Sequence, residues 1–194
     1  MRAAGEATRE RILAAAKAEF AQYGIAGARI NRIATAARAS KDRLYAYFPG
    51  KRELYIAVTE RWTAETTAET ALRADDVPGY VGRLFDHFVA NPDNARLQAW
   101  SELEPADDDA IAEVVRRTID PKLAELRRGQ QEGLITAEIP APALLRMLTD
   151  LARTSAMHAV LADRRGSQRL SSQRAATVLA ASRLVAPRAA RSRR

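Results

Sequence analysis

Apolar residues recur at intervals of three and four along nearly all of this chain, and no stretch alternates apolar and polar residues as a half-buried strand does. The 194 residues include only 9 glycines and 8 prolines, the residues that most often end helices and form turns. About 47% of the residues are hydrophobic, which supplies enough apolar surface for a packed core. The sequence therefore predicts an all-α fold.

The apolar pattern divides into about nine helices, the first three short and the later ones longer. We expect helices over residues 8–23, 30–37, 41–48, 51–73, 77–89, 94–103, 107–133, 143–164 and 169–186. The pair Asp120-Pro121 either kinks the helix over 107–133 or begins a new one. The second and third helices are joined by about four residues, which matches a helix-turn-helix.

Positive charge is concentrated near the N-terminus. The chain carries a formal net charge of +7, and residues 1–52 alone hold 11 Lys and Arg against 4 Asp and Glu. Residues 53–187 carry a small negative net charge, whereas residues 188–194 contain four arginines and are predicted to be a basic, disordered tail. A basic segment joined to a mildly acidic one favours binding of nucleic acid by the basic part.

Several kinds of site are excluded by composition. Cysteine is absent, and the two histidines, His87 and His158, lie far apart and are interpreted as partly buried core residues. We therefore predict no metal, no cofactor and no catalytic residues, and the chain is not expected to be an enzyme. The sequence contains no long apolar run and no leading apolar segment, so we expect no membrane association and a cytoplasmic location.

A specific motif extends from residue 33 to residue 54. It consists of Ile33-Ala34, a turn ending in Ser40, Leu44-Tyr45, an aromatic pair ending in Phe48, and then Pro49-Gly50 before a Leu-led helix. Together with the helix over 8–23, it resembles the DNA-binding head of the TetR family of transcriptional repressors. Residues 129–135 resemble a phrase that is common before the last two helices of such proteins.

The resemblance implies a division of the chain into domains. Residues 1–50 form a three-helix, helix-turn-helix DNA-binding head. Residues 51–187 form a larger helical body for ligand binding and dimerisation, and residues 188–194 form the tail.

Two positions depart from the family pattern. Arg38-Ala39 stands where the family has Gly and an aliphatic residue, so either Arg38 adopts a strained conformation or the turn closes differently. Ala28-Arg29 replaces the usual Thr, so the second helix is expected to lack a side-chain N-cap, whereas Ser40 is placed to cap the third.

The resemblance also implies which side chains contact DNA. A recognition helix enters the major groove by its N-terminal end, so base-edge contacts are predicted from Lys41, Asp42, Arg43 and Tyr45. Phosphate contacts are predicted from Arg29, Asn31, Ser40, Tyr47 and Lys51. Arg43 can pair with guanine O6 and N7, whereas Asp42 either accepts from cytosine N4 or caps the helix. Leu44 and Phe48 are expected to face the core, and core packing is the alternative for both tyrosines.

By resemblance, the body holds a pocket for a small molecule. Aromatic and polar residues are the candidates to line it: Trp62, Tyr80, Phe88, Trp100, Met147, Leu151, Thr154 and His158. For each of them the alternative is core packing. Small residues recur on the last two helices and favour either a homodimer interface or packing within the chain: Ala152, Ser155, Ala156, Ala159, Ala175, Ala176 and Ala180.

The predicted function is that of a sequence-specific DNA-binding transcriptional regulator. We expect a repressor that is released from a palindromic double-stranded DNA operator by a small-molecule inducer. A homodimer is expected because one head reads only a few base pairs. A non-specific architectural DNA-binding protein and an all-helical enzyme are the alternatives.

Overall fold

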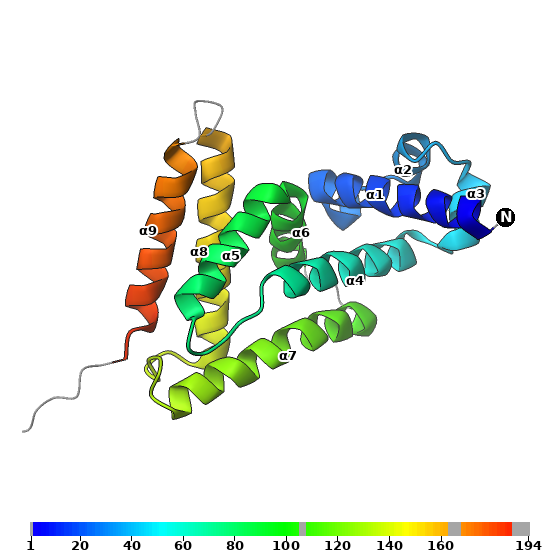
Figure 1. Ribbon diagram of the computed structural model, residues 1–194. Coiled ribbons are helices and arrows are strands. Elements are labelled where there is room, and N and C mark those ends of the chain that lie inside the picture. The colour runs from blue at the N-terminus through cyan, green and yellow to red at the C-terminus, as the bar shows by residue number, and fades with distance from the viewer. Residues whose placement is uncertain (1, 105–107, 163–167, 188–194) are drawn as a thin grey trace, which may run out of the picture. The chain divides into compact units, whose positions relative to one another are not determined.

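The structure, a computed structural model, describes residues 2–104, 108–162 and 168–187. These residues form nine helices and no strand, which confirms the predicted all-α fold (Figure 1). The helices are α1 (Arg2–Gly27), α2 (Ile30–Ala36), α3 (Lys41–Tyr47), α4 (Lys51–Glu69), α5 (Val77–Ala90), α6 (Pro92–Leu103), α7 (Asp109–Gln131), α8 (Ala141–Ala162) and α9 (Gln168–Val185). None of the described helices has the length and apolar character needed to cross a bilayer. The predicted tail at residues 188–194 lies outside the described residues.

Spatial contacts divide the chain into two compact units. Unit 1 comprises Met1–Glu65 and Pro92–Arg116, and unit 2 comprises Thr66–Asn91 and Arg117–Arg194. The boundary after Glu65 falls inside α4, and the boundary after Arg116 falls inside α7. Both helices therefore contribute residues to both units. The predicted head, residues 1–50, lies wholly within unit 1, and its functional boundary stays a prediction.

Large apolar side chains of α1 form the centre of the core of unit 1. Ile12 and Phe20 are fully buried, and the ring of Phe20 meets that of Tyr55 edge to face with 5.1 Å between centroids. Leu44 is 0% exposed and Phe48 is 4% exposed, which confirms that both face the core. Burial of each such side chain contributes about 1.5–3 kcal/mol, so this core holds α2 and α3 against α1.

The first helix does not end at residue 23, as expected: Gly24 interrupts α1, and the helix resumes for a few residues beyond it. The backbone of Gly24 has φ 67° and ψ −178°, and a β-carbon there would lie 2.9 Å from Cε3 of Trp100. The break leaves backbone N–H and C=O groups without hydrogen-bond partners inside the helix. Nε1 of Trp100 donates to the carbonyl of Ala21 at 3.1 Å, and the carboxylate of Glu104 accepts from the amide of Ile25 at 3.1 Å. Side chains from 79 positions away therefore satisfy the interrupted helix.

Most helix boundaries differ from the expected ones by one or two residues, but α1 begins at Arg2, six residues earlier than expected. α4 ends at Glu69, four residues earlier than expected, because the next backbone groups bind side chains. Arg83 donates to the carbonyl of Ala71 at 3.0 Å, and Glu125 accepts from the amide of Ala74 at 2.9 Å. α7 continues from Asp109 to Gln131 with Pro121 inside it, so no new helix begins there.

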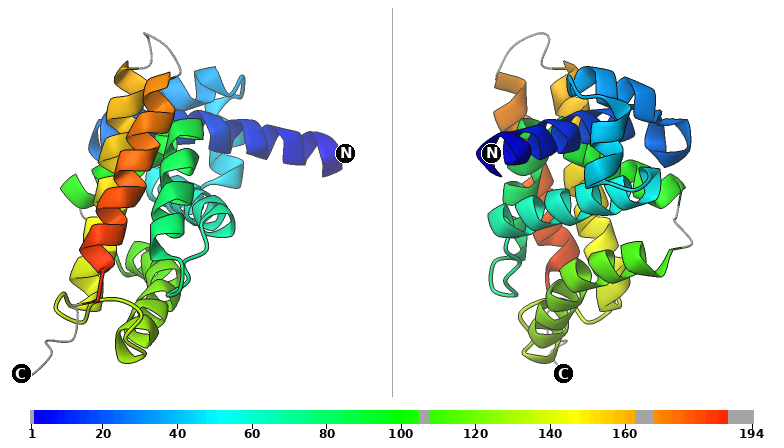
Figure 2. Two further views of the ribbon diagram at one scale, coloured as in Figure 1. Left: turned by 60° about the vertical axis from the view of Figure 1, so that its left-hand side comes forward. Right: turned by 90° about the vertical axis from the view of Figure 1, so that its right-hand side faces the viewer.

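In unit 2, α5 packs against α8 and α9, which lie side by side (Figure 2). Tyr80, Phe85 and Phe88 of α5 are all at most 2% exposed. The amide of Thr136 donates to the carbonyl of Val185 at 2.9 Å, which ties the segment after α7 to the end of α9.

The small residues of α8 and α9 differ in their surroundings. Those of α8 are buried within the single chain: Ala152, Ser155, Ala156 and Ala159. Those of α9 are exposed: Ala175, Ala176 and Ala180. The small residues of α8 therefore pack within unit 2, whereas those of α9 remain available to a partner.

Candidate nucleic-acid interface

The turn between α2 and α3 closes through two characteristic backbone hydrogen bonds. The amide of Arg38 donates to the carbonyl of Thr35 at 3.1 Å, and that of Ala39 donates to the carbonyl of Ala34 at 3.0 Å. This pair of bonds is the Schellman arrangement, which requires a left-handed residue, and Arg38 has φ 52°. Of the two possibilities left open by the sequence, the strained conformation is therefore the one adopted.

Ser40 is the N-cap of α3, as the sequence predicts. Its hydroxyl accepts a hydrogen bond from the amide of Arg43 at 3.2 Å. Asp42 lies in the first turn, where a negative charge is favourable near the positive end of the helix dipole. The cap fixes the first turn of α3, from which the side chains of Lys41 and Arg43 extend.

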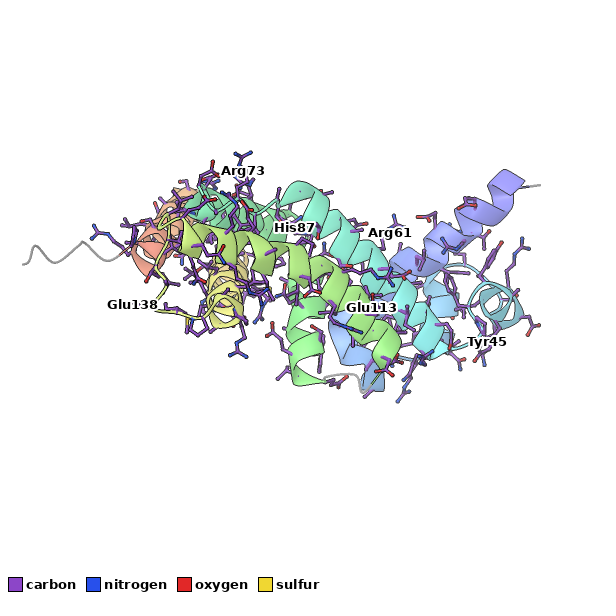
Figure 3. All side chains as sticks on the ribbon, turned by 90° about the horizontal axis from the view of Figure 1, so that it is seen from below. Tyr45, Arg61, Arg73, His87, Glu113 and Glu138 are labelled. Carbon is purple, nitrogen blue, oxygen red and sulfur yellow. The ribbon has the colours of Figure 1, made fainter. Side chains whose placement is uncertain are left out.

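The side chains predicted to read base edges lie on the surface of α3. Lys41, Asp42 and Arg43 are exposed. Tyr45, which is labelled in Figure 3, is 46% exposed, which excludes core packing for it. Among the described residues, the side chains of Lys41 and Arg43 have no hydrogen bond or ion pair. They are therefore free to bind an external partner.

The start of α2 lacks a side-chain cap, as predicted. Glu19 of α1 replaces it: its carboxylate accepts from the amide of Arg29 at 2.9 Å and from Nε of Arg32 at 2.7 Å. The side chains of Arg29 and Asn31 are exposed, and Asn31 lines an open surface concavity on α2. Both predicted phosphate-binding side chains are thus accessible.

Two further residues predicted to bind phosphates, Tyr47 and Lys51, make hydrogen bonds within the protein. The hydroxyl of Tyr47 donates to the carbonyl of Gly5 at 3.0 Å. Because a phenol has one proton, Tyr47 cannot donate to a phosphate while it keeps this bond. Nζ of Lys51 lies 3.4 Å from the carbonyls of Ala26 and Ala28 and has three protons, so it can bind a phosphate as well.

Comparison with known proteins identifies the family. Residues 12–58 match the family model described as bacterial regulatory proteins, tetR family. Residues 76–183 match the model described as the tetracyclin repressor-like C-terminal domain. The chain belongs to the TetR family.

Relatives support the TetR assignment over most of the chain. The protein is 43% identical to the HTH-type transcriptional repressor SCO4008 of Streptomyces coelicolor over 148 residues, which cover 76% of this chain and 77% of the relative. The crystal structure of the regulator SCO4942 from Streptomyces coelicolor has a TM-score of 0.77 and 42% identity, covering 93% of this chain and 99% of that one. A TetR family regulator from Marinobacter aquaeolei VT8 shares the fold, with a TM-score of 0.78 at 19% identity over 97% and 100% of the two chains.

A TetR family chain with this head is a DNA-binding transcriptional regulator. An architectural DNA-binding role and an enzymatic role are therefore not favoured.

The residues predicted to line the TetR ligand pocket fall into different surroundings. Trp62 and Trp100 belong to unit 1, where Trp62 is part of the core and Trp100 is hydrogen-bonded beside Gly24. In unit 2, two of the set are fully buried on α5, Tyr80 and Phe88. The other four lie on α8, where Leu151 is half-buried and three are exposed: Met147, Thr154 and His158.

Lys122 was not among the predicted ligand-binding residues. Its Nζ lies 5.6 Å from the centroid of the Tyr80 ring, and no hydrogen bond or ion pair of its ammonium occurs among the described residues. Burial lowers the pKa of Lys122 and raises the pKa of Tyr80 to about 12. The only signal in the sequence was that Lys122 is the one lysine after residue 51.

His87 is a core residue, as predicted. It is 3% exposed, its Nε2 lies 3.1 Å from Oγ1 of Thr66, and its Nδ1 lies 2.6 Å from a carboxylate oxygen of Glu69. Both ring nitrogens therefore have partners within unit 2. His158, in contrast, is exposed.

Proposed function

We propose that this TetR family regulator is a repressor that binds a palindromic double-stranded DNA operator as a homodimer and is released by a small-molecule inducer. The proposal depends on one observation above all: Lys41 and Arg43 are exposed on a capped helix and have no partner among the described residues. The similarity to SCO4008, which is named a repressor, supports repression rather than activation. Regulation of chromosomal DNA implies a cytoplasmic location and requires no catalytic residue or cofactor.

Residues of α3 provide the sequence preference in this proposal. Arg43 donates two hydrogen bonds to guanine O6 and N7, and Lys41, Asp42 and Tyr45 contact neighbouring base edges. The phosphate contacts come from Arg29, Asn31, Ser40 and Lys51, whereas Tyr47 must first release its bond to Gly5. The DNA-binding domain comprises residues 1–50, and residues 51–187 form the regulatory domain.

The homodimer is proposed to form through α8 and α9. Leu161 and Leu179 are 65% and 57% exposed, and Ala176 and Ala180 of α9 are exposed near Leu179. Small residues allow helices to approach closely, and exposed leucines supply apolar surface to bury. Two heads in one dimer bind half-sites about one DNA turn (~34–36 Å), or a multiple of that, apart.

The inducer is proposed to bind in the body. Lys122 is half-buried, and its ammonium lies beside the buried ring of Tyr80, which supports a ligand that carries an acidic group. The aromatic and polar residues predicted for the pocket that belong to unit 2 would contact the rest of the ligand. A ligand switches the regulator only if it binds the DNA-free arrangement more tightly than the DNA-bound one.

Selection of bound fragments from sheared genomic DNA tests the proposed function. We expect a fragment that binds about 10³-fold or more tightly than bulk DNA, and a solution mass of about two chains of 21.3 kDa. Leu179→Asp is expected to give monomers that lose the operator, whereas the matched change Leu134→Asp, at a leucine that is 44% exposed after α7, is expected to leave the dimer intact. Equal affinity for all fragments would instead identify an architectural protein. Adding small carboxylic acids to the complex of the protein with its selected fragment tests the proposed inducer. We expect one of them to release the DNA.

A further inference from the structure

Arg38 is the most strained position of the helix-turn-helix. Among the described residues other than glycine, it alone has a positive φ, at 52°. Glycine adopts this conformation without steric cost, whereas a residue with a β-carbon does not. The Schellman hydrogen bonds of the turn use only the backbone of Arg38, so they do not explain why an arginine stands there.

The side chain of Arg38 makes no polar contact within the described part of the protein. It is exposed, and its guanidinium makes no hydrogen bond or ion pair there. Arg11, in contrast, binds the same turn: its Nε donates to the carbonyl of Ala37 at 3.2 Å, and its other nitrogens donate to Ala7 and Thr8. One arginine at this turn therefore binds the protein itself, whereas the donors of the other face solvent.

Arg38 lies two residues before Ser40, the cap of α3, and close in sequence to the exposed side chains of Lys41 and Arg43. The N-terminal end of a recognition helix enters the major groove, so the residues just before it lie at the edge of the groove, beside the phosphates. An arginine there can bind a phosphate oxygen with its forked donors. We propose that Arg38 is an additional DNA contact, to a backbone phosphate, and that its strained conformation is retained for this contact. This inference rests on the proposed function, because it requires the head to bind duplex DNA.

The test separates strain from charge by four variants of the full-length chain. Arg38→Gly removes both strain and charge, Arg38→Asn keeps a residue that tolerates positive φ but removes the charge, and Arg38→Lys keeps both. Arg127→Ala removes one charge from an exposed position of α7, where the side chain has no hydrogen bond or ion pair with another described residue. Each is compared with the native chain by thermal unfolding and by titration of duplex binding against salt concentration.

We expect Arg38→Gly to melt at a higher temperature than the native chain and yet to bind DNA more weakly. Each lost phosphate contact lowers the salt slope by about 0.9, so a dimer loses about two. Its disadvantage in affinity then shrinks about tenfold between 50 and 200 mM salt. Arg38→Asn is expected to show the same loss of slope, whereas Arg38→Lys and Arg127→Ala keep the native slope.

Three results would overturn the inference. One is a stabilised Arg38→Gly variant with unchanged affinity and slope, which would mean that the arginine does not contact DNA. Another is loss of operator preference at an unchanged slope, which would indicate a base contact. The third is equal weakening by Arg38→Lys, which would indicate an effect on the turn. Because phosphate contacts do not depend on sequence, the slope is also measured on a duplex of scrambled sequence. The test of Arg38 can therefore still be interpreted if the protein proves to have no specific operator.

Discussion

Basic side chains have different partners in unit 2 and in the helix-turn-helix of unit 1. In unit 2, several arginines lie within 2.9 Å of carboxylate oxygens: Arg83, Arg128 and Arg174. Between residues 29 and 47, four basic side chains make no hydrogen bond or ion pair among the described residues: Arg29, Arg38, Lys41 and Arg43. In that segment, the basic side chain bound to a carboxylate is Arg32.

The net charge of a segment does not show whether its basic side chains are paired with carboxylates or are available to a partner, and this difference does. An arginine adds little positive charge to a surface if a carboxylate lies beside it, as at Arg83, Arg128 and Arg174 of unit 2. The helix-turn-helix keeps Glu19 for Arg32, which holds the start of α2, and leaves the charges around α3 uncompensated. Those charges remain available for the phosphates and base edges of DNA.

Replacing an uncompensated side chain is expected to have the largest effect on DNA binding. Arg43→Ala should lower the preference for the operator over a scrambled duplex by about 1–3 kcal/mol, because a bidentate contact with guanine is lost. Dissociation constants for the two duplexes at one salt concentration measure this preference. Arg127→Ala serves as the control and should leave it unchanged. If Arg43→Ala weakened both duplexes equally, Arg43 would be a phosphate contact.

Lys122 differs from the paired arginines of unit 2, because it is partly buried and yet its ammonium has no carboxylate partner among the described residues. Burial lowers its pKa in the folded state below the ordinary value of 10.5, so its charge opposes folding. Stability should therefore rise as pH increases through the lowered pKa toward 10.5. Lys122→Met should add about 1 kcal/mol to the free energy of unfolding at pH 7 and remove this rise.

Urea unfolding of the ligand-free protein between pH 7 and 10 measures both effects. The matched control is Lys17→Met, since Lys17 is paired with Glu65 at 3.1 Å and its loss should not stabilise the protein. A destabilised Lys122→Met variant would show that the ammonium has a favourable environment. Lys122 would then resemble the paired arginines of unit 2.

Lys51 is intermediate between the two groups, because it binds backbone carbonyls but has donors to spare. Lys51→Ala should weaken binding to every duplex by about threefold and lower the salt slope by about one per head, since a phosphate contact carries no sequence information. Salt titrations on the operator and on a scrambled duplex provide the measurement. A change in the ratio of the two affinities would instead assign Lys51 to a base edge.

The helices and the cap of α3 could be predicted because they depend on neighbouring residues. Spacings of three and four define the helices, and Ser40 binds an amide only three residues later. The continuation of α1 beyond Gly24 could not be predicted, because its partners, Trp100 and Glu104, lie 79 positions away.

The candidate sites were predictable to different extents for the same reason. The exposed face of α3 follows from one short helix whose buried residue is Leu44. The pocket residues follow from the positions of several helices, and an aromatic residue has the same helical spacing in a core as in a pocket. The sequence therefore does not distinguish the two for Trp62, which packs in the core of unit 1. The unpaired ammonium of Lys122 could not be predicted, because it depends on where the carboxylates of other helices lie.

The smallest expected effect concerns a compensated pair of unit 2. Glu125 accepts from Arg128 at 2.7 Å and from the amide of Ala74 at 2.9 Å, and these bonds lower its pKa from 4.5 to about 2. Because the pKa is lower in the folded state, the stabilisation is present above pH 4.5 and is lost as pH falls to about 2. Solvent screens this exposed pair, so Glu125→Gln should cost only about 0.5 kcal/mol at neutral pH and should flatten the dependence of unfolding on pH in that range. The control, Glu132→Gln, removes a carboxylate that is bound by Arg128 and, among the described residues, by no other side chain. It should change stability less, and neither variant should alter the salt slope of DNA binding. If Glu125→Gln did change that slope, compensated charges of unit 2 would contribute to DNA binding, and the contrast with the helix-turn-helix would fail.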